Sequence, residues 1–207
     1  MAAENTITIT NSTANNNKLK VAIFQKSEQP TSKEVVAWRV VSPAAGGGKG
    51  FVQVPDDYAI AVKLEDNSVS YITNQCGFSS YSANLTLNAI EDDQSGQRTF
   101  SLSLDASGTQ ADPNNHVTVE IPRQVAKEVK VELLKDGDLI LPSVATKPGE
   151  MADFVIVPTF YLAVVEQDTK PGELLSARTI SDTLTPIRPG QMATITEDNQ
   201  GYHMSIN

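Results

Sequence analysis

Phe51-Val-Gln-Val-Pro-Asp-Asp-Tyr-Ala-Ile-Ala-Val62 is the stretch that decides the fold, because a similar stretch returns 103 residues later. The second copy is Phe154-Val-Ile-Val-Pro-Thr-Phe-Tyr-Leu-Ala-Val-Val165, and Phe, Val, Val, Pro, Tyr and Val recur in register. Each copy has a proline between two apolar segments, where it cannot donate a hydrogen bond to a β-ladder. We therefore interpret each proline as the mark of an edge, a bulge or a crossing between sheets, and not of a binding site.

Blocks on either side of this stretch repeat in the same order. Residues 7–23 match residues 117–133 at a spacing of 110, and residues 100–104 match residues 202–206 at a spacing of 102. The change in spacing falls in loop regions, where insertions are tolerated. Several blocks recurring in one order predict two structural units that arose by internal duplication.

The repeat also sets the predicted domain boundaries. The stretch between the copies, residues 105–115, is rich in Asp, Asn, Ser, Gly and Pro, as a linker would be. We therefore predict a first β-sandwich over residues 1–104, a linker over 105–115 and a second β-sandwich over 116–207.

Alternation of apolar and polar residues dominates the local pattern. Thr6-Ile-Thr-Ile-Thr10 places isoleucine and threonine on opposite faces of a strand. The same pattern recurs in residues 18–23, 100–104, 117–121 and 129–133. The best helix candidate, residues 124–134, fits period 2 better than period 3.6. The sequence thus predicts an all-β protein made of two similar antiparallel β-sandwich halves, with little or no helix.

Composition restricts the partners and the location. The chain of 207 residues has 16 Lys and Arg against 25 Asp and Glu, a net charge of −9, and its basic residues are scattered singly. This charge argues against nucleic acid as a partner. The single cysteine excludes an intrachain disulfide, and no apolar stretch reaches the ~18 residues that span a bilayer. The first residues lack a signal-peptide pattern, so we expect a cytoplasmic protein, with export by another route left open.

Short blocks along the chain also suggest a family. In the first half they occur in this order: Ile9-Thr-Asn-Ser-Thr13, Phe24-Gln25, Val36-Ala-Trp38, Pro43, Gly46-Gly-Gly48 and Phe51 to Tyr58. This order resembles the RhiA-like proteins, bacterial proteins first named for expression in the rhizosphere. Val54 departs from it, because an aromatic residue is expected before Pro55. The resemblance implies an all-β protein linked to colonisation or community behaviour, and it supplies no catalytic or binding residues.

Catalytic groups are few. The chain has two histidines, His116 and His203, and no Gly-x-Ser-x-Gly motif, so a nucleophile with an adjacent base is not indicated. One Cys and two distant His exclude a structural zinc site. We therefore predict that the protein is not an enzyme and that it has no cofactor and no bound metal.

Calcium is the metal that the sequence excludes least firmly. Oxygen ligands could come from the acidic turn Asp92-Asp-Gln-Ser95 or from the linker residues Asp105, Ser107 and Asp112. Neither run has the spacing of a known calcium-binding loop, and acidic turns are usually solvated. The sequence therefore favours no bound metal and leaves calcium binding open.

Three residues are candidates for binding. Trp38 lies in a run of β-branched residues and is either a core residue or a sugar-stacking platform, of which the core is favoured. Lys49 follows a glycine-rich loop that lacks the spacing of a phosphate-binding loop, so a hairpin is the better reading. Cys76 has no nearby cationic residue that would lower its pKa, and a spectator role is favoured.

Two functions follow from these observations. The favoured one is a non-enzymatic protein that associates with itself, as a homo-oligomer or larger assembly, through exposed strand edges. The alternative is a module that binds a carbohydrate or a cell-surface partner with loops at one end of the sandwich.

Overall fold

The computed structural model describes residues 5–14, 18–27, 34–66, 69–73, 75–78, 83–91, 98–104, 115–125, 127–176 and 184–207. In these residues the regular secondary structure is entirely β-strand, which confirms the predicted all-β fold. The chain divides into two compact units: unit 1 contains residues 1–26, 30–55 and 157–207, and unit 2 contains residues 27–29 and 56–156.

Unit 1 contains two main sheets and a small one. The first sheet has the order β19-β18-β1-β5, and in the second β2 lies between β4 and the latter part of β15, with β17 on the other side of β15. The strands are β1 (Thr6–Asn11), β2 (Lys20–Ser27), β3 (Glu34–Val36), β4 (Arg39–Val41), β5 (Gly48–Gln53), β15 (Met151–Val165), β16 (Leu174–Ser176), β17 (Thr185–Ile187), β18 (Met192–Asp198) and β19 (Gly201–Ile206). The short pair β16-β3 forms the small sheet.

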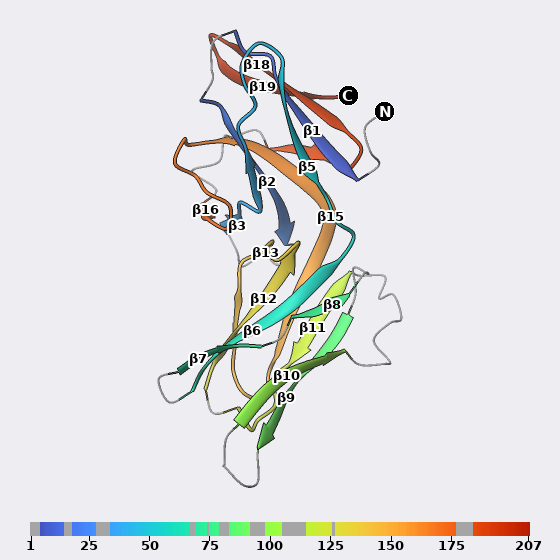
Figure 1. Ribbon diagram of the computed structural model, residues 1–207, viewed down its shortest axis with the longest axis vertical. Helices are drawn as coiled ribbons and strands as arrows, with labels where there is room; N and C mark the ends of the chain where they lie inside the picture. Colours follow the sequence, from blue (N-terminus) through green and yellow to red (C-terminus); the bar gives the residue numbers. More distant parts are fainter. Residues whose placement is uncertain are drawn as a thin grey trace. The chain divides into compact units, whose positions relative to one another are not determined.

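Unit 2 contains two sheets. One has the order β10-β9-β11 followed by the first part of β15, and the other has β12 and β6 at its centre, flanked by β13 and β14 on β12 and by β7 and β8 on β6. The strands are β6 (Tyr58–Asp66), β7 (Val69–Ile72), β8 (Cys76–Phe78), β9 (Ala83–Glu91), β10 (Arg98–Leu104), β11 (His116–Glu120), β12 (Val129–Lys135), β13 (Asp138–Leu139) and β14 (Val144–Thr146). In Figure 1 β15 is one long strand, whose first residues belong to unit 2 and whose last residues belong to unit 1.

The two units have corresponding strand pairings. The pairs β19–β18, β1–β18 and β1–β5 are antiparallel, parallel and antiparallel, and the pairs β10–β9, β11–β9 and β11–β15 follow the same sequence of directions. Each unit therefore has a parallel pair, β1–β18 or β11–β9, beside antiparallel neighbours, a feature that alternation alone could not predict. This correspondence supports the proposed duplication, which stays a prediction.

The units do not follow the predicted boundaries of 1–104 and 116–207. β1, from the first copy, pairs with β18 from the second, and β12, from the second copy, pairs with β6 from the first. The chain passes from unit 1 to unit 2 after Pro55 and returns after Ile156. Both proline motifs thus lie where the chain passes from one unit to the other.

Burial follows the alternation of each strand. In unit 1, Ile7 and Ile9 of β1 are fully buried, and Ile195 of β18 is buried beside them. β2 is buried on both faces, because Phe24 packs against Leu175 of β16 on the face opposite Ile23. Apolar area removed from water in this way is the main force that holds each unit together.

Three turns share the pattern of a basic residue, Pro, Gly and then Glu or Gln. In each, the backbone N–H of the fourth residue donates to the carbonyl of the first at 3.0–3.2 Å, and a side-chain oxygen of the fourth accepts from the N–H of the first. The glycines have φ between 83° and 86°, as the third position of a type II turn requires. Each glycine N–H also donates to a neighbouring segment: Gly149 to Ile121, Gly172 to Ala37 and Gly190 to Thr6.

Candidate functional site

Trp38 lies in the core of unit 1. Its side chain is 0% exposed, and its ring lies 5.5 Å from the ring of Phe160. The guanidinium carbon of Arg39 lies over the Trp38 ring, 4.7 Å from the ring centroid. A ring buried to this extent cannot stack on a sugar in solution, so the structure favours the core role among the two that the sequence left open.

Lys49 and Cys76 lie in different units. Lys49 is exposed on β5, opposite Thr10 of β1, whereas Cys76 is partly buried on β8, opposite Ile60 of β6. Because Trp38 is enclosed in the core, it does not share a surface with Lys49. The three predicted residues therefore do not form one site.

The glycine-rich loop before Lys49 is held by backbone and amide hydrogen bonds. Gly47 N–H donates to the carbonyl of Asn11 at 2.7 Å, and the fully buried Asn11 side chain donates from Nδ2 to the carbonyl of Pro43 at 2.9 Å. Asn11 Oδ1 accepts from both the N–H and the hydroxyl of Thr13. The loop joins β4, which pairs with β2, to β5, which pairs with β1 in another sheet, so the predicted hairpin is wrong and the loop is an ordered connection between two sheets.

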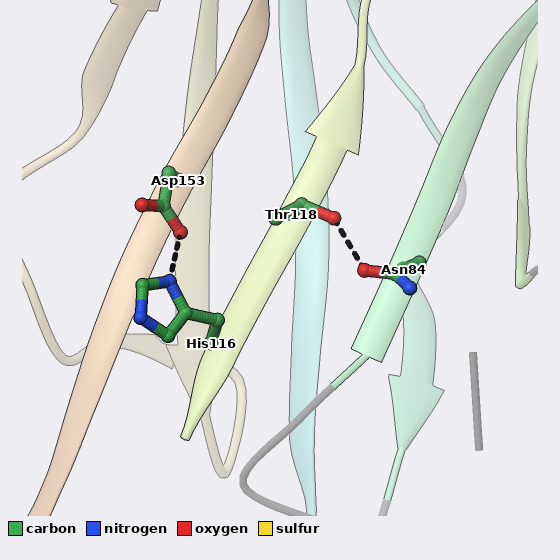
Figure 2. Close-up of polar contacts among 4 residues, drawn as sticks. All are labelled: Asn84, His116, Thr118 and Asp153. Atoms are coloured by element: carbon green, nitrogen blue, oxygen red, sulfur yellow. Dashed lines mark hydrogen bonds and ion pairs between the residues drawn. The ribbon is translucent and has the colours of Figure 1, made fainter. Parts of the chain in front are cut away.

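A polar sheet face in unit 2 carries two side-chain pairs, Asn84 with Thr118 and His116 with Asp153 (Figure 2). Asn84 of β9, Thr118 of β11 and Asp153 of β15 lie opposite one another across three strands. The Thr118 hydroxyl donates to Asn84 Oδ1 at 2.6 Å, and His116 Nδ1 lies 2.9 Å from Asp153 Oδ1. The His116 and Asp153 side chains are 33% and 41% exposed, so this face meets solvent.

The geometry of this face does not form a nucleophile. Asp153 orients His116 as the acid of a catalytic pair would, with Nδ1 toward the carboxylate. The hydroxyl of Thr118, two residues from His116 on the same strand, donates its proton to Asn84 and not to the histidine ring. The four side chains therefore form an ordered hydrogen-bonding surface and supply no base for Thr118.

The most unusual side chain is one that the sequence reasoning missed. Lys135 is the last residue of β12 and is only 3% exposed. It lies opposite Tyr58 of β6, which in turn lies opposite Phe78 of β8, so the three side chains share one face of the sheet. Tyr58 and Phe78 are buried as well, which places the lysine on the core side.

Its surroundings perturb the charge of Lys135. The Nζ atom lies 3.7 Å from the centroid of the Tyr58 ring, an arrangement in which the ring face attracts a cation. Burial lowers the pKa of Lys135 from 10.5 to about 8, and the negative charges of Asp56 and Asp57 oppose this shift. A group whose pKa is perturbed by burial and by specific charge partners is a candidate functional residue, and Lys135 meets this description.

A sequence signal for Lys135 did exist. Val129, Val131 and Leu133 alternate toward the core, and Lys135 continues that phase. At the spacing of 110 that relates the two copies, its counterpart is Gln25 of β2, which is also buried. Gln25 donates from Nε2 to the carbonyl of Val157 at 2.9 Å, so unit 1 has a neutral amide where unit 2 has an amine.

The outer strands β10 and β19 are a second candidate, for contact with a partner. β9 is the only strand that pairs with β10 in the described residues, and β10 has no charged residue, Pro or Gly from Thr99 to Leu104. Its apolar residues are only partly covered, with Leu104 37% exposed, whereas Leu85 and Leu87 of the neighbouring β9 are buried.

β19 repeats this gradient in unit 1. Tyr202, Met204 and Ile206 are partly exposed, whereas Ala193 and Ile195 of the adjacent β18 are fully buried. In both units the apolar face of a sheet thus extends from a buried strand onto an edge strand, where the apolar side chains are partly exposed.

The described residues contain neither a cluster of metal ligands nor a membrane-spanning helix. In the part of the chain that the structure describes, no three His, Cys, Asp or Glu side chains gather as metal ligands would. The two calcium candidates, at residues 92–95 and 105–112, lie outside the described residues. No described segment forms a helix long and apolar enough to cross a membrane.

The chain matches no protein-family model and no curated protein sequence.

Proposed function

We propose that the protein is a non-enzymatic structural protein whose copies associate through the edge strands β10 and β19. The observation that carries this proposal is the partly exposed apolar side of both edges, beside neighbours that are fully buried. A further strand added at either edge would cover these side chains and would pair its backbone with the open side of the ladder. The resemblance to RhiA-like proteins, if it reflects kinship, would connect such assembly with colonisation or community behaviour.

The composition of β10 supports this proposal. Natural edge strands usually avoid pairing by means of charge, proline or a bulge. The segment Thr99-Phe-Ser-Leu-Ser-Leu104 has β-forming residues, no charge and no proline, which is typical of segments that pair with other chains. Because one such edge lies in each unit, one chain offers two places for association.

The test is the size of the protein in solution, measured by light scattering after size exclusion over a range of concentrations. Ser101→Lys in β10 and Ser205→Lys in β19 each place a charge on an edge, and Ser143→Lys places the same charge on an exposed loop residue as the control. We expect the wild type and the control to form oligomers, each edge variant to form smaller species, and the double variant to be monomeric. A wild type that stays monomeric throughout would refute the proposal.

One observation favours the carbohydrate-binding alternative, namely the exposure of the Phe51 ring. This ring is 65% exposed on β5, with Lys49 and Gln53 exposed on the same side of the strand. Thr6 donates to Gln53 Oε1 at 3.1 Å, which leaves the Gln53 amide group to donate outward. An exposed ring beside polar groups is a common platform for a sugar.

Affinity electrophoresis in gels that contain dextran or alginate would test this platform. Retardation of the wild type that is lost in Phe51→Ala, and kept in the matched control Leu174→Ala, would favour the alternative; Leu174 is 52% exposed in the same unit. Equal mobility of the wild type with and without either polysaccharide would argue against it.

A further inference from the structure

β10 extends both faces of its sheet beyond β9. On the apolar face, Leu102 lies opposite the buried Leu87 of β9 and is itself partly exposed. On the polar face, Ser103 Oγ accepts a hydrogen bond from Asn88 Nδ2 at 2.8 Å and keeps its own hydrogen for a further acceptor. In the described residues β9 is the one strand that pairs with β10. The side of β10 that faces away from β9 is therefore the place where a further strand would extend the sheet.

The residue pattern of β10 is symmetric about its centre. The middle residue of the strand is Ser101. Phe100 and Leu102 lie on either side of it, and Thr99 and Ser103 follow at the next positions outward. An apolar residue thus matches an apolar residue, and a hydroxyl matches a hydroxyl, when the segment is read in either direction. Antiparallel pairing of a strand with a second copy of itself requires this symmetry.

We infer that β10 pairs in antiparallel direction with β10 of a second copy of the chain, with Ser101 opposite Ser101 on a twofold axis perpendicular to the sheet. The inference rests on the proposed function, and it names the partner and the register of one of the two edges. The pair joins the sheets of two copies of unit 2 into one continuous sheet, and the twofold axis keeps both apolar faces on the same side.

In this register both faces of the new strand pair are matched. Phe100 lies opposite Leu102 of the second copy, so each chain covers apolar surface that is partly exposed in the other. Thr99 lies opposite Ser103 of the second copy, whose hydroxyl hydrogen has the threonine oxygen as its acceptor. A shift by one residue would place Phe100 opposite a serine and would put the two apolar faces on opposite sides. A shift by two residues keeps the faces but pairs fewer residues.

The other edge strand, β19, fits β10 less well than a second β10 does. β19 carries His203, whose Nε2 atom lies 2.9 Å from Asp198 Oδ1 of β18. A strand added beside this pair would remove water from an ionised carboxylate, which costs free energy. β19 also begins with Gly201, and glycine weakens a strand. β10 has neither a charged residue nor a glycine from Thr99 to Leu104, so two copies of it pair without this cost.

The experiment is cysteine cross-linking of the full chain in a Cys76→Ser background. Directly opposite residues of an antiparallel pair have Cα atoms about 4.5 or 5.5 Å apart, and both separations suit a disulfide. Ser101→Cys should therefore form a disulfide-linked dimer under mild oxidation with copper–phenanthroline, measured on a non-reducing gel.

The neighbouring hydroxyl residues provide matched controls. In Thr99→Cys alone, and in Ser103→Cys alone, the two introduced cysteines of a pair lie about 13 Å apart along the strands. Each should give at least about five-fold less dimer than Ser101→Cys, because that separation is too long for a disulfide. A mixture of the two variants should cross-link, because position 99 of one copy lies opposite position 103 of the other.

Charge complementation tests the same register without a new thiol. Like charges directly opposite each other destabilise a strand pair, and opposite charges stabilise it. Ser101→Lys alone and Ser101→Glu alone should each reduce the dimer seen by light scattering, and an equal mixture of the two should restore it. Ser143→Lys and Ser143→Glu, at an exposed loop residue, are the control pair and should leave the dimer unchanged, alone or mixed.

Three results would overturn the inference. A cross-link between Ser101→Cys and Ser205→Cys, without one between two copies of Ser101→Cys, would make β19 the partner and leave the proposed function intact. An oligomeric wild type whose Ser101→Cys variant forms neither cross-link would assign the association to another surface. A wild type that is monomeric at every concentration would refute the proposed function as well. Light scattering thus decides whether copies associate, and cross-linking decides what β10 pairs with, so the two can fail separately.

Discussion

The ammonium nitrogen of Lys135 lies 3.7 Å from the ring centroid of Tyr58, and both side chains are buried on the core face of one sheet. A cation in this place loses most of its hydration, and one aromatic ring does not replace it. The lowered pKa of Lys135 reflects this cost, because Lys135 in the fold binds its proton less tightly than Lys135 in the unfolded chain. Two predictions about stability follow.

The first concerns pH. Unfolded Lys135 keeps its proton up to about pH 10.5, whereas folded Lys135 loses it at about pH 8. Between these values the unfolded chain binds more protons, so the free energy of unfolding should rise with pH, by at most about 3 kcal/mol. Urea denaturation at pH 7.5 and pH 9.5 would measure the rise. A fall across this interval in the wild type, relative to Lys135→Met, would contradict the prediction.

The second concerns removal of the charge. Lys135→Met keeps an unbranched chain beside Tyr58 and removes the buried ammonium, and Asp56 and Asp57 are exposed enough to stay hydrated. The free energy of unfolding at pH 7 should increase by about 1–3 kcal/mol. Lys130→Met, on the exposed face of the strand, is expected to change it by less than about 0.5 kcal/mol. A destabilised Lys135→Met protein would mean that the attraction of the ammonium to Tyr58, Asp56 and Asp57 outweighs the cost of burial.

The third prediction concerns Asn11, whose enclosed side chain joins Pro43 and Thr13. Asn11→Ala leaves these buried polar groups without their partner and should destabilise the protein by about 1–3 kcal/mol. Thermal unfolding would show a lower Tm. Thr10→Ala, on the outward face of the same strand, should cost less, and equal losses in both variants would assign the effect to strand propensity and not to the hydrogen bonds.

The fourth concerns Gly172, which has φ of +83° in the turn Lys170-Pro-Gly-Glu173. An added Cβ at Gly172 meets no atom within 4 Å, so Gly172→Ala tests backbone conformation alone, and it should cost about 1–2 kcal/mol. At Gly149, which has the same φ, the Cβ would also lie 3.0 Å from Arg123 Cγ. Gly149→Ala should therefore be the worse of the two in urea denaturation, and a neutral Gly172→Ala would contradict the strain argument.

Strand positions could be predicted from the sequence, but strand partners could not. The alternating stretches at residues 6–10, 100–104 and 129–133 all became strands, because alternation reports which face of a strand is buried. It does not report which strand lies alongside. The first copy's Ile9 thus pairs with Ala193 from the second copy, and the predicted halves gave way to two units with exchanged strands.

Around Phe51 the strand pairing differs by one residue from the register of the predicted repeat. Ile7 pairs with Val52 in unit 1, and its counterpart Val117 pairs with Phe154 in unit 2. Val52 and Phe154 are buried and Phe51 is exposed, so Phe154 corresponds to Val52 in pairing and burial, and not to Phe51. A shift of one residue moves a side chain to the other face of a strand, and letter identity does not detect it.

Sequence patterns predicted the environment of Trp38 but only part of the environment of Lys135. Trp38 could be assigned to the core from its β-branched neighbours, since such runs are typical of strands buried on both faces. Lys135 was predictable in principle from its phase with Leu133, but the acidic residues that act on it lie in a distant part of the chain. Charge partners of this kind come from tertiary structure and not from spacing.

The passage of the chain between the units has a consequence for synthesis on the ribosome. All strands of unit 2 have been made once residue 156 emerges, whereas β1 must wait for β18, more than 180 residues later, before its parallel neighbour exists. β1 can pair early with β5, but the edge that β18 covers has no partner from this chain until then. During that interval this edge of β1 is open to pairing with another chain.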